Sequence, residues 1–246
     1  MKKDWFVPML VFVISVIFFE IALTVANIST FIFPKPSLIF LALIENWQWI
    51  LENLSVTLAE ALIGFGLSII WGIGLALVYE FIPFLRNIIL TFTIAIRNVP
   101  FVAISPILFM IFGYGQLPKI LIVMVVSFFP IMVNVIAGLA SVNQNQMERF
   151  YVLKANKWQI FTKLKLPTAI PYLIVGLDIA GSNMIIAAIV GELLGTTKGL
   201  GFIIVMAVSQ YRFALLMAAV LVTTLISIGL TWLMKYFSRQ LFKKWL

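Results

Sequence analysis

The residues that could do chemistry in this sequence are five charged side chains set within or beside long apolar runs. They are Glu20, Glu60, Arg97, Asp178 and Glu192. The chain has no Cys and no His, which excludes thiolate and imidazole metal sites, haem ligation, Cys nucleophiles and Ser-His catalysis. Two interpretations of the five charges stay open: they form structural ion pairs, or some of them line a polar path or hold a gate.

The composition places these charges in a membrane protein. Of the 246 residues, 63% are apolar and 11% are charged, against 45–50% and about a quarter in soluble domains. The apolar runs reach about 20 residues, the length that crosses about 30 Å of hydrocarbon. The predicted fold class is therefore all-α: a polytopic membrane bundle of about six transmembrane helices, forming one domain over residues 1–246.

Six segments have the length and composition of a membrane span. We predict spans at 5–26, 54–79, 88–112, 117–139, 168–193 and 213–237. The first lacks a good signal-peptide cleavage site and is interpreted as a retained helix. Residues 37–53 predict an external amphipathic helix with Ser37 as its N-cap. Pro100 and Pro130 indicate that the third and fourth spans are kinked or broken, and the short apolar stretch 202–208 cannot cross.

The basic residues give the orientation. Twelve of the 17 Lys and Arg side chains fall on the face that carries the N-terminus, namely Lys2, Lys3, Arg86, Arg149, Lys154, Lys157, Lys163, Lys165, Lys235, Arg239, Lys243 and Lys244. Four fall on the other face: Lys35, Lys119, Lys198 and Arg212. Because Lys and Arg concentrate in cytoplasmic loops, both termini are predicted to be cytoplasmic.

Small residues recur every four positions along the second predicted span. They are Gly64, Ser68, Gly72 and Ala76. Small residues let membrane helices approach closely, so we favour helix packing over a substrate-lining role for this stripe. The charge of Arg97 could meet Glu60 or Asp178, which we place in the inner or middle parts of their spans. Glu20 is expected to reach the headgroups.

The longest cytoplasmic loop, 141–167, is amphipathic. Apolar residues such as Phe150, Trp158 and Phe161 alternate with basic ones such as Lys157 and Lys163. This pattern predicts a helical hairpin presented to a protein partner. The alternative is a basic helix lying on anionic lipid.

This loop resembles that of permease subunits of bacterial type I ATP-binding-cassette importers. In those proteins Glu-Ala-Ala is followed by three residues, Gly, nine residues and Ile-x-Leu-Pro. Here Glu148 begins the pattern, Lys154 occupies the Gly position, and Leu164-Lys165-Leu166-Pro167 ends it. Arg149 and Phe150 stand in place of the two alanines. Residues 97–100 and 191–195 are similar to the branch that handles nitrate, sulfonates, taurine and pyrimidine precursors.

The resemblance implies a transport subunit without catalytic residues of its own. It would form the path for a small anionic or heteroaromatic solute, delivered by an extracytoplasmic solute-binding protein, as a dimer of permeases in a bacterial inner membrane. A separate ATPase dimer would bind ATP and Mg²⁺; the chain lacks the Gly-x4-Gly-Lys-Ser/Thr loop that would do so, and no cofactor or metal is expected in it. Nucleic-acid binding is not expected.

The resemblance also implies the functional residues. The ATPase-coupling loop residues would be Glu148, Arg149, Phe150, Tyr151, Lys154, Ala155, Trp158, Leu166 and Pro167. The path or gate residues would be Glu60, Arg97, Asp178, Asn183 and Glu192. An ATPase-independent secondary transporter, which would use the acidic residues as a relay, is the alternative.

Overall fold

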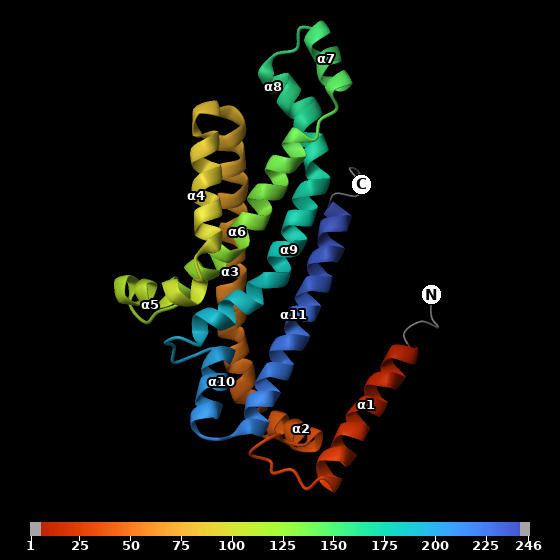
Figure 1. Cartoon of the computed structure of the whole chain (residues 1–246), viewed down its shortest axis with the longest axis vertical. Coiled ribbons are helices and arrows are strands. Elements are labelled where there is room, and N and C mark those ends of the chain that lie inside the picture. Colours follow the sequence, from red (N-terminus) through yellow and green to blue (C-terminus); the bar gives the residue numbers. More distant parts are fainter. Residues whose placement is uncertain (1–5, 242–246) are drawn as a thin grey trace. The chain divides into compact units, whose positions relative to one another are not determined.

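The computed structural model describes residues 6–241, and every regular element within them is a helix (Figure 1). The elements are α1 (Phe6–Val25), α2 (Pro36–Glu45), α3 (Trp47–Phe81), the 3₁₀ turn η1 (Pro83–Leu85), α4 (Arg86–Asn98), α5 (Phe101–Phe112), α6 (Leu117–Ala140), α7 (Gln144–Val152), α8 (Lys157–Ile160), the π-helical turn η2 (Phe161–Lys165), α9 (Leu166–Glu192), α10 (Leu200–Ser209) and α11 (Phe213–Leu241). The all-α prediction is confirmed.

Four helices of the described chain are long and apolar enough to cross a membrane. They are α3, α6, the continuous helix formed by α8, η2 and α9, and α11. They correspond to the second, fourth, fifth and sixth predicted spans. The first predicted span is α1, and the stretch 202–208 lies in α10, which has only 10 residues. The orientation and the assignment of one domain over 1–246 stay predictions.

The prediction of one span over 88–112 is wrong in its extent, because the chain breaks there into α4 and α5. Val99 and Pro100 are extended, with ψ of 126° and 114°. A proline has no N–H for the helix and pushes the residue before it out of the helical region. The break therefore falls at Pro100, as the proline pattern indicates.

The prediction of one helix over 37–53 is also wrong. Asn46 interrupts the helix, and α3 begins at Trp47. Ser37 is not the N-cap; that position is Lys35, because Pro36 already occupies the first turn of α2. The Ser37 N–H and hydroxyl instead donate to the Glu20 carboxylate, at 2.9 and 2.8 Å.

Contacts divide the chain into two compact units. The first contains the residues up to Val56 and Thr197–Thr224. Within it, α10 packs on the beginning of α3: the Gly199 N–H donates to Asn53 Oδ1 at 2.7 Å, and the Trp49 and Phe202 rings meet edge to face. The second unit contains Thr57–Thr196 and the residues from Leu225 onward.

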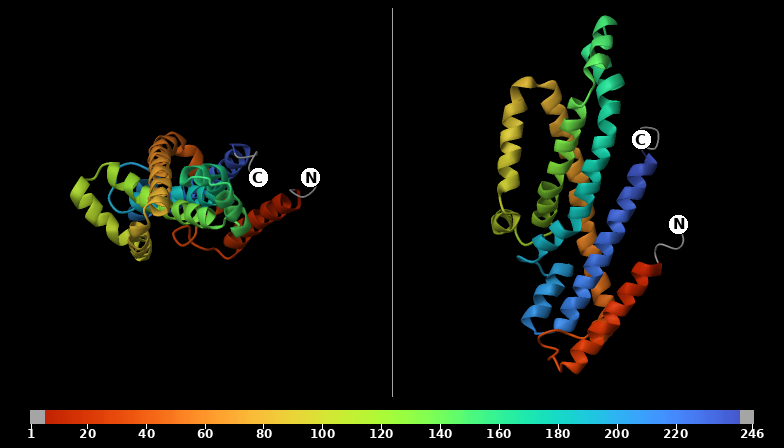
Figure 2. Two further views of the ribbon diagram at one scale, coloured as in Figure 1. Left: turned by 90° about the horizontal axis from the view of Figure 1, so that it is seen from above. Right: turned by 45° about the vertical axis from the view of Figure 1, so that its right-hand side comes forward.

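In the second unit, α3, α4, α6 and α9 run alongside one another, and α7 and α8 lie beyond one end of α6 and α9 (Figure 2). Glycines set the closest approaches. A Cβ on Gly64 would lie 2.6 Å from Val123 Cβ, and one on Gly72 would lie 2.9 Å from the Phe128 carbonyl oxygen. The small-residue stripe of α3 is thus a contact with α6, which confirms the packing interpretation.

The helices α6 and α9 meet in the same way. A Cβ on Gly138 would lie 2.8 Å from Ala169 Cα, and one on Gly176 would lie 3.0 Å from Ile131 Cα. The first contact lies next to the loop that joins the helices, and the second lies about two turns further along them. Close packing in the halves of α6 and α9 next to the loop therefore fixes where the loop leaves α6 and where it enters α9.

Candidate functional site: the loop between α6 and α9

Two side-chain caps shape the loop between α6 and α9. Asn143 precedes α7, and its Oδ1 accepts a hydrogen bond from the Asn145 N–H at 2.8 Å. Asn156 precedes α8 and forms a reciprocal pair with Gln159, each side chain accepting from the other's backbone N–H at 2.8 and 2.9 Å. Such caps satisfy N–H groups that the first turn of a helix leaves unpaired. The loop is therefore the helical hairpin that its pattern predicts.

Lys154 makes the turn between the two helices. Its φ is +52°, in the left-handed region that favours glycine. The Ala155 N–H donates to the Phe150 carbonyl at 3.0 Å and the Lys154 N–H to the Tyr151 carbonyl at 2.9 Å, the bonding pattern of a Schellman helix end. The position where the resembling proteins carry Gly thus has a left-handed backbone conformation, which glycine adopts more easily than any other residue.

The exposed side chains of the loop form a surface at its tip. Tyr151, Val152 and Leu153 are apolar and exposed, with exposed fractions of 63%, 82% and 76%. Among the other predicted coupling residues, Glu148, Arg149, Lys154, Trp158 and Leu166 are exposed, and Phe150, Ala155 and Pro167 are half-buried. We call Glu148, Arg149, Tyr151, Val152 and Leu153 the tip surface. Val152 and Leu153 are absent from the predicted set, although their apolar character on an otherwise polar helix is a signal for them.

A second group of contacts holds the base of the loop. Lys165 Nζ lies 2.5 Å from Glu80 Oε1, which joins η2 to the last turn of α3. The Phe81 ring packs against Phe161 and Trp158, with ring centroids 4.9 and 6.3 Å apart. Sequence reasoning missed Glu80, because nothing in the sequence pairs it with a residue 85 positions away.

Glu60, one of the two partners expected for Arg97, is paired with another cation. Glu60 of α3 forms a salt bridge with Lys119 of α6, and both side chains are buried. Nearby, Thr57 Oγ1 donates to Glu192 Oε1 at 2.6 Å, also buried. Lys119 is thus a buried, paired cation, and the placement of Glu60 within the membrane stays a prediction. The Arg97 side chain lies outside the described part of the structure.

The other two predicted path residues are in α9. Asp178 and Asn183 are half-buried, and the Asp178 carbonyl accepts from Ser182 Oγ at 2.8 Å. Gly181, between them, faces Met234 of α11, where an added Cβ would lie 3.1 Å from Met234 Cγ. The structure therefore brings Glu60 and Glu192 to one region and leaves Asp178 and Asn183 in another.

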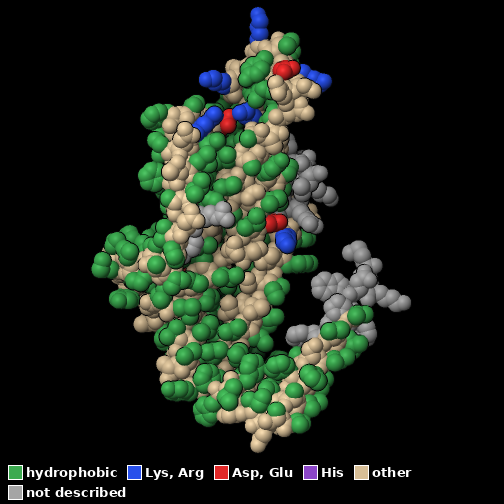
Figure 3. Space-filling view, viewed as in Figure 1, with side chains coloured by type: hydrophobic (Ala, Val, Ile, Leu, Met, Phe, Trp, Pro, Cys, Tyr) green, Lys and Arg blue, Asp and Glu red, His purple; other side chains and the backbone are tan. Residues whose placement is uncertain are grey.

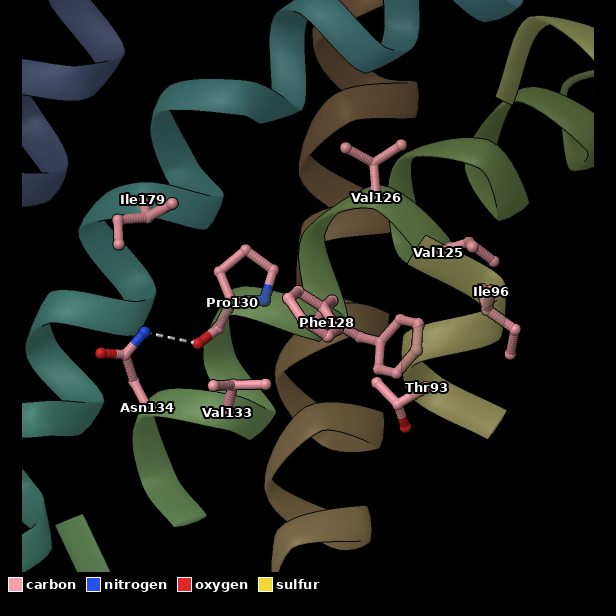
Figure 4. Close-up of a pocket in the computed structure, with 10 residues that line it drawn as sticks. Thr93, Ile96, Val125, Val126, Phe128, Pro130, Val133, Asn134 and Ile179 are labelled. Carbon is pink, nitrogen blue, oxygen red and sulfur yellow. Dashed lines mark hydrogen bonds between the residues drawn. The ribbon is translucent and has the colours of Figure 1, made fainter. Parts of the chain in front are cut away.

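A cavity of about 340 Å³ opens between α4, α6 and α9. Its lining is apolar and aromatic with a few polar groups: Thr93, Ile96, Val125, Val126, Phe128, Phe129, Pro130, Val133, Asn134 and Ile179. Asn134 Nδ2 donates to the Pro130 carbonyl at 2.8 Å (Figure 4). Pro130 has no N–H, so the Val126 carbonyl loses its helical donor at this cavity. Glu60, Asp178, Asn183 and Glu192 are not among the residues that line it.

Together, these features define a polytopic helical membrane protein with a capped helical hairpin between α6 and α9. Residues 64–243 match the family of binding-protein-dependent transport system inner membrane components. The chain belongs to this family: it is the permease component of a binding-protein-dependent ABC importer. Family membership favours this class over an ATPase-independent secondary transporter, and it makes the chain a transport subunit with ATPase and binding-protein partners in general.

Several relatives cover most of the chain. The formylaminopyrimidine transport permease ThiX of Halalkalibacterium halodurans is 31% identical over 90% of this chain and 88% of its own length. The riboflavin transport permease RibX of Chloroflexus aurantiacus is 27% identical over 87% and 81%. The taurine transport permease TauC of Escherichia coli is 29% identical over 62% and 56%.

Solved structures show the same fold. An amino acid ABC transporter solved with histidines matches 82% of this chain and 98% of its own with a TM-score of 0.70, at 16% identity. The MetNI methionine ABC transporter in an inward-facing conformation matches the same shares with a TM-score of 0.68, at 18% identity. The predicted type I importer fold is confirmed.

Proposed function

We propose that this permease couples to a separate ATPase through the loop 141–167 and moves a small solute that an extracytoplasmic binding protein delivers. Two copies form the path as a homodimer in a bacterial cytoplasmic membrane, with both termini in the cytoplasm. The ATPase dimer binds ATP and Mg²⁺ and hydrolyses the ATP. Closure of the ATPases moves the loops, and the bundles alternate between access to the two sides.

The observation that carries this proposal is the tip surface. An exposed apolar cluster on a capped two-helix hairpin is the shape that a groove in a protein partner accepts. Basic side chains gather over α7, α8 and the adjoining end of α3, while the flanks of the bundle are mainly hydrophobic (Figure 3). Positive charge at one end of a lipid-facing bundle supports a cytoplasmic position for the loop.

The cavity between α4, α6 and α9 is the part of the path that we assign to this copy. Its aromatic and amide groups suit a neutral or weakly charged heteroaromatic solute. The two relatives above that cover more than four fifths of this chain are named for formylaminopyrimidine and riboflavin, which supports a nitrogen heterocycle over a sulfonate. An Asn134→Leu variant should fold and dock normally but transport poorly.

Glu60 and Glu192 we assign to closing the end of the path away from the loop. Both are buried, and each is bonded to another helix or turn of the same region: Glu60 to Lys119, and Glu192 to Thr57. Arg97, Asp178 and Asn183 stay candidates for the path, each on α4 or α9, the helices that line the cavity.

Co-purification from a native-like membrane tests the proposal. The wild type should bring down an ATPase subunit, and a solute-binding protein retained with it would lead to the substrate. A Val152→Asp, Leu153→Asp variant should lose the ATPase, because two carboxylates would enter an apolar contact. A Gln146→Asp variant adds a charge to an exposed position of the same helix outside the tip surface, and it should keep the ATPase.

A Glu148→Ala, Trp158→Ala variant provides a second comparison. It removes a tip charge and an exposed ring at the base, and the retained ATPase should decrease. If the wild type elutes alone in a detergent that keeps a control importer intact, the loop is not the ATPase contact. Equal ATPase recovery with Val152→Asp, Leu153→Asp and with Gln146→Asp would remove the tip surface from the proposal.

A further inference from the structure

A second cavity, of about 240 Å³, lies at the base of the loop, and we call it the basal cavity. It is formed by the end of α3, η1, the start of α4, α7, α8 and η2. Its lining residues are Glu80, Phe81, Pro83, Arg86, Met147, Tyr151, Lys157, Ile160, Phe161 and Lys165. Tyr151 is the one lining residue that also belongs to the tip surface, and none of these residues lines the cavity between α4, α6 and α9.

The basal cavity carries more positive than negative charge. Three of its lining side chains are cations, and one, Glu80, is a carboxylate. Glu80 is already paired with Lys165. No ion pair of Arg86 or Lys157 is found among the described side chains. Two positive charges therefore remain without a carboxylate partner at one cavity.

The Arg86 side chain is held by backbone carbonyls, which leave its positive charge unneutralised. Its Nε donates to the Tyr79 carbonyl at 3.0 Å and its Nη2 to the Glu80 carbonyl at 3.1 Å, and its guanidinium lies 5.4 Å from the Tyr79 ring centroid. These bonds cap the last carbonyls of α3 with a cation, which the helix dipole favours. Five N–H groups are available on a guanidinium, so donors remain for an anion.

Apolar side chains flank these cations. Phe81 and Pro83 line the cavity, and the neighbouring Ile82 and Phe84 are exposed, Phe84 by 82%. Ile70 and Trp71, further back along α3, are exposed as well. A cationic recess with an apolar edge at the end of a membrane-length helix matches a phospholipid: a phosphate for the cations and acyl chains for the edge.

We propose that the basal cavity binds the phosphate of an anionic phospholipid. The phosphate accepts hydrogen bonds from Lys157 Nζ and the remaining Arg86 N–H groups, and the acyl chains lie against Phe84. Since Lys157 begins α8 and Arg86 begins α4, the bound lipid ties the loop to the membrane helices. The proposal goes beyond coupling and requires only that this end of α3 reaches a headgroup layer.

A carboxylate of the ATPase partner could also neutralise two cations, and the structure favours the lipid. The tip surface, on the exposed side of α7, is where a protein partner meets the loop. The basal cavity instead lies beside the exposed apolar side chains of Ile82 and Phe84. A carboxylate of a protein partner would leave these side chains in water, whereas the acyl chains of a lipid would cover them.

Lipid titration of the purified full-length chain tests the proposal. The probe is short-chain phosphatidylglycerol in detergent, and the readout is the number of lipids retained in native mass spectra. Phosphatidylcholine with the same chains controls for the apolar edge, and inorganic phosphate controls for the anion alone. The wild type should bind phosphatidylglycerol more tightly than phosphatidylcholine or inorganic phosphate. Its affinity for phosphatidylglycerol should fall as the salt concentration rises.

Two lysines of the same short segment give a matched pair of variants. Lys157→Gln should raise the apparent Kd for phosphatidylglycerol about fivefold, the effect of one cation near an anionic headgroup. Lys163→Gln, exposed and outside the cavity lining, should bind like wild type. Phe84→Ser should weaken phosphatidylglycerol binding and leave phosphate binding unchanged.

Three outcomes would overturn the lipid assignment. Equal Kd values for Lys157→Gln and Lys163→Gln would show that the basal cavity is not the site. Competition by inorganic phosphate at equal affinity would make free phosphate the ligand. Loss of the lipid when the ATPase is assembled on the chain would assign the cations to the protein partner.

Discussion

Glu60 and Lys119 form a salt bridge in which both side chains are buried, and it joins the first half of α3 to the first turn of α6. Removing one partner of a buried pair leaves an unpaired charge in a low-dielectric region, which costs about 3–5 kcal/mol. We therefore expect Lys119→Met to lower the unfolding temperature strongly in detergent. The double variant Glu60→Gln, Lys119→Met should recover much of the loss, because neither charge remains.

The same double variant separates structural from gating roles. If the pair only holds helices together, the folded double variant should transport solute at a rate per molecule near that of wild type. A double variant that is stable but does not transport, or that leaks solute without ATP, would show that the pair acts in the gate. A double variant as unstable as Lys119→Met alone would contradict the ion-pair account.

Lys154 stands in the left-handed turn between α7 and α8, where a side chain costs roughly 1–2 kcal/mol. Lys154→Gly should remove this cost and stabilise the hairpin by about 1 kcal/mol. The measurement is protection of the loop amides from hydrogen exchange. Leu153→Gly is the control: its φ is −77°, so it should lose protection. If Lys154→Gly and Leu153→Gly change the amide protection equally, the turn at Lys154 is not strained.

The approach of α3 to α6 gives a prediction with internal controls. Gly64→Ala would place its Cβ 2.6 Å from Val123 Cβ, whereas a Cβ on Gly66 meets nothing within 4 Å. The first change should destabilise by about 1–3 kcal/mol and the second very little. Gly72→Ala and Gly74→Ala repeat the comparison two turns further on. Thermal unfolding of the four variants should divide them into these two pairs.

The sequence predicts the helices well because apolar length, prolines and small residues act locally. The break at Pro100 follows from the missing N–H of one residue, and the stripe from Gly64 follows from spacing on one helix. It predicts the 37–53 region less well, since the single residue Asn46 decides whether one helix or two form there. Apolar length alone does not show that α3 begins at Trp47.

The candidate site divides in the same way. The tip of the loop is visible in the sequence because Glu148 and Lys154 stand at a family spacing within one segment. The contacts at the base of the loop cannot be predicted from the sequence, because Glu80 and Lys165 become neighbours only when α3 packs against the helix formed by η2 and α9. The partner of Glu60 was missed for a similar reason: Lys119 sits near Pro118 at the start of a predicted span, where a lysine is expected to reach solvent.

The Glu80 to Lys165 bridge predicts how movement of the loop reaches α3. The two side chains are mostly buried and 2.5 Å apart, and they are the one charged link found between the described parts of the loop and α3. Lys165→Glu should place two carboxylates together, weaken this link, and lower the solute transported per ATP hydrolysed several-fold. The ATPase should still co-purify, because the tip surface is unchanged.

Reversing both charges tests whether coupling depends on the attraction between residues 80 and 165 or on the identity of each residue. Glu80→Lys, Lys165→Glu restores an attractive pair in the opposite sense, and it should recover much of the transported-to-hydrolysed ratio. Lys163→Glu, two residues away and exposed, controls for the charge change on the loop. The ratio is the informative quantity, since a merely unstable variant loses transport and stimulated hydrolysis together. If the reversed pair couples no better than Lys165→Glu alone, the bridge does not transmit the motion, and the aromatic contacts of Phe81 with Phe161 and Trp158 become the connection between the loop and α3.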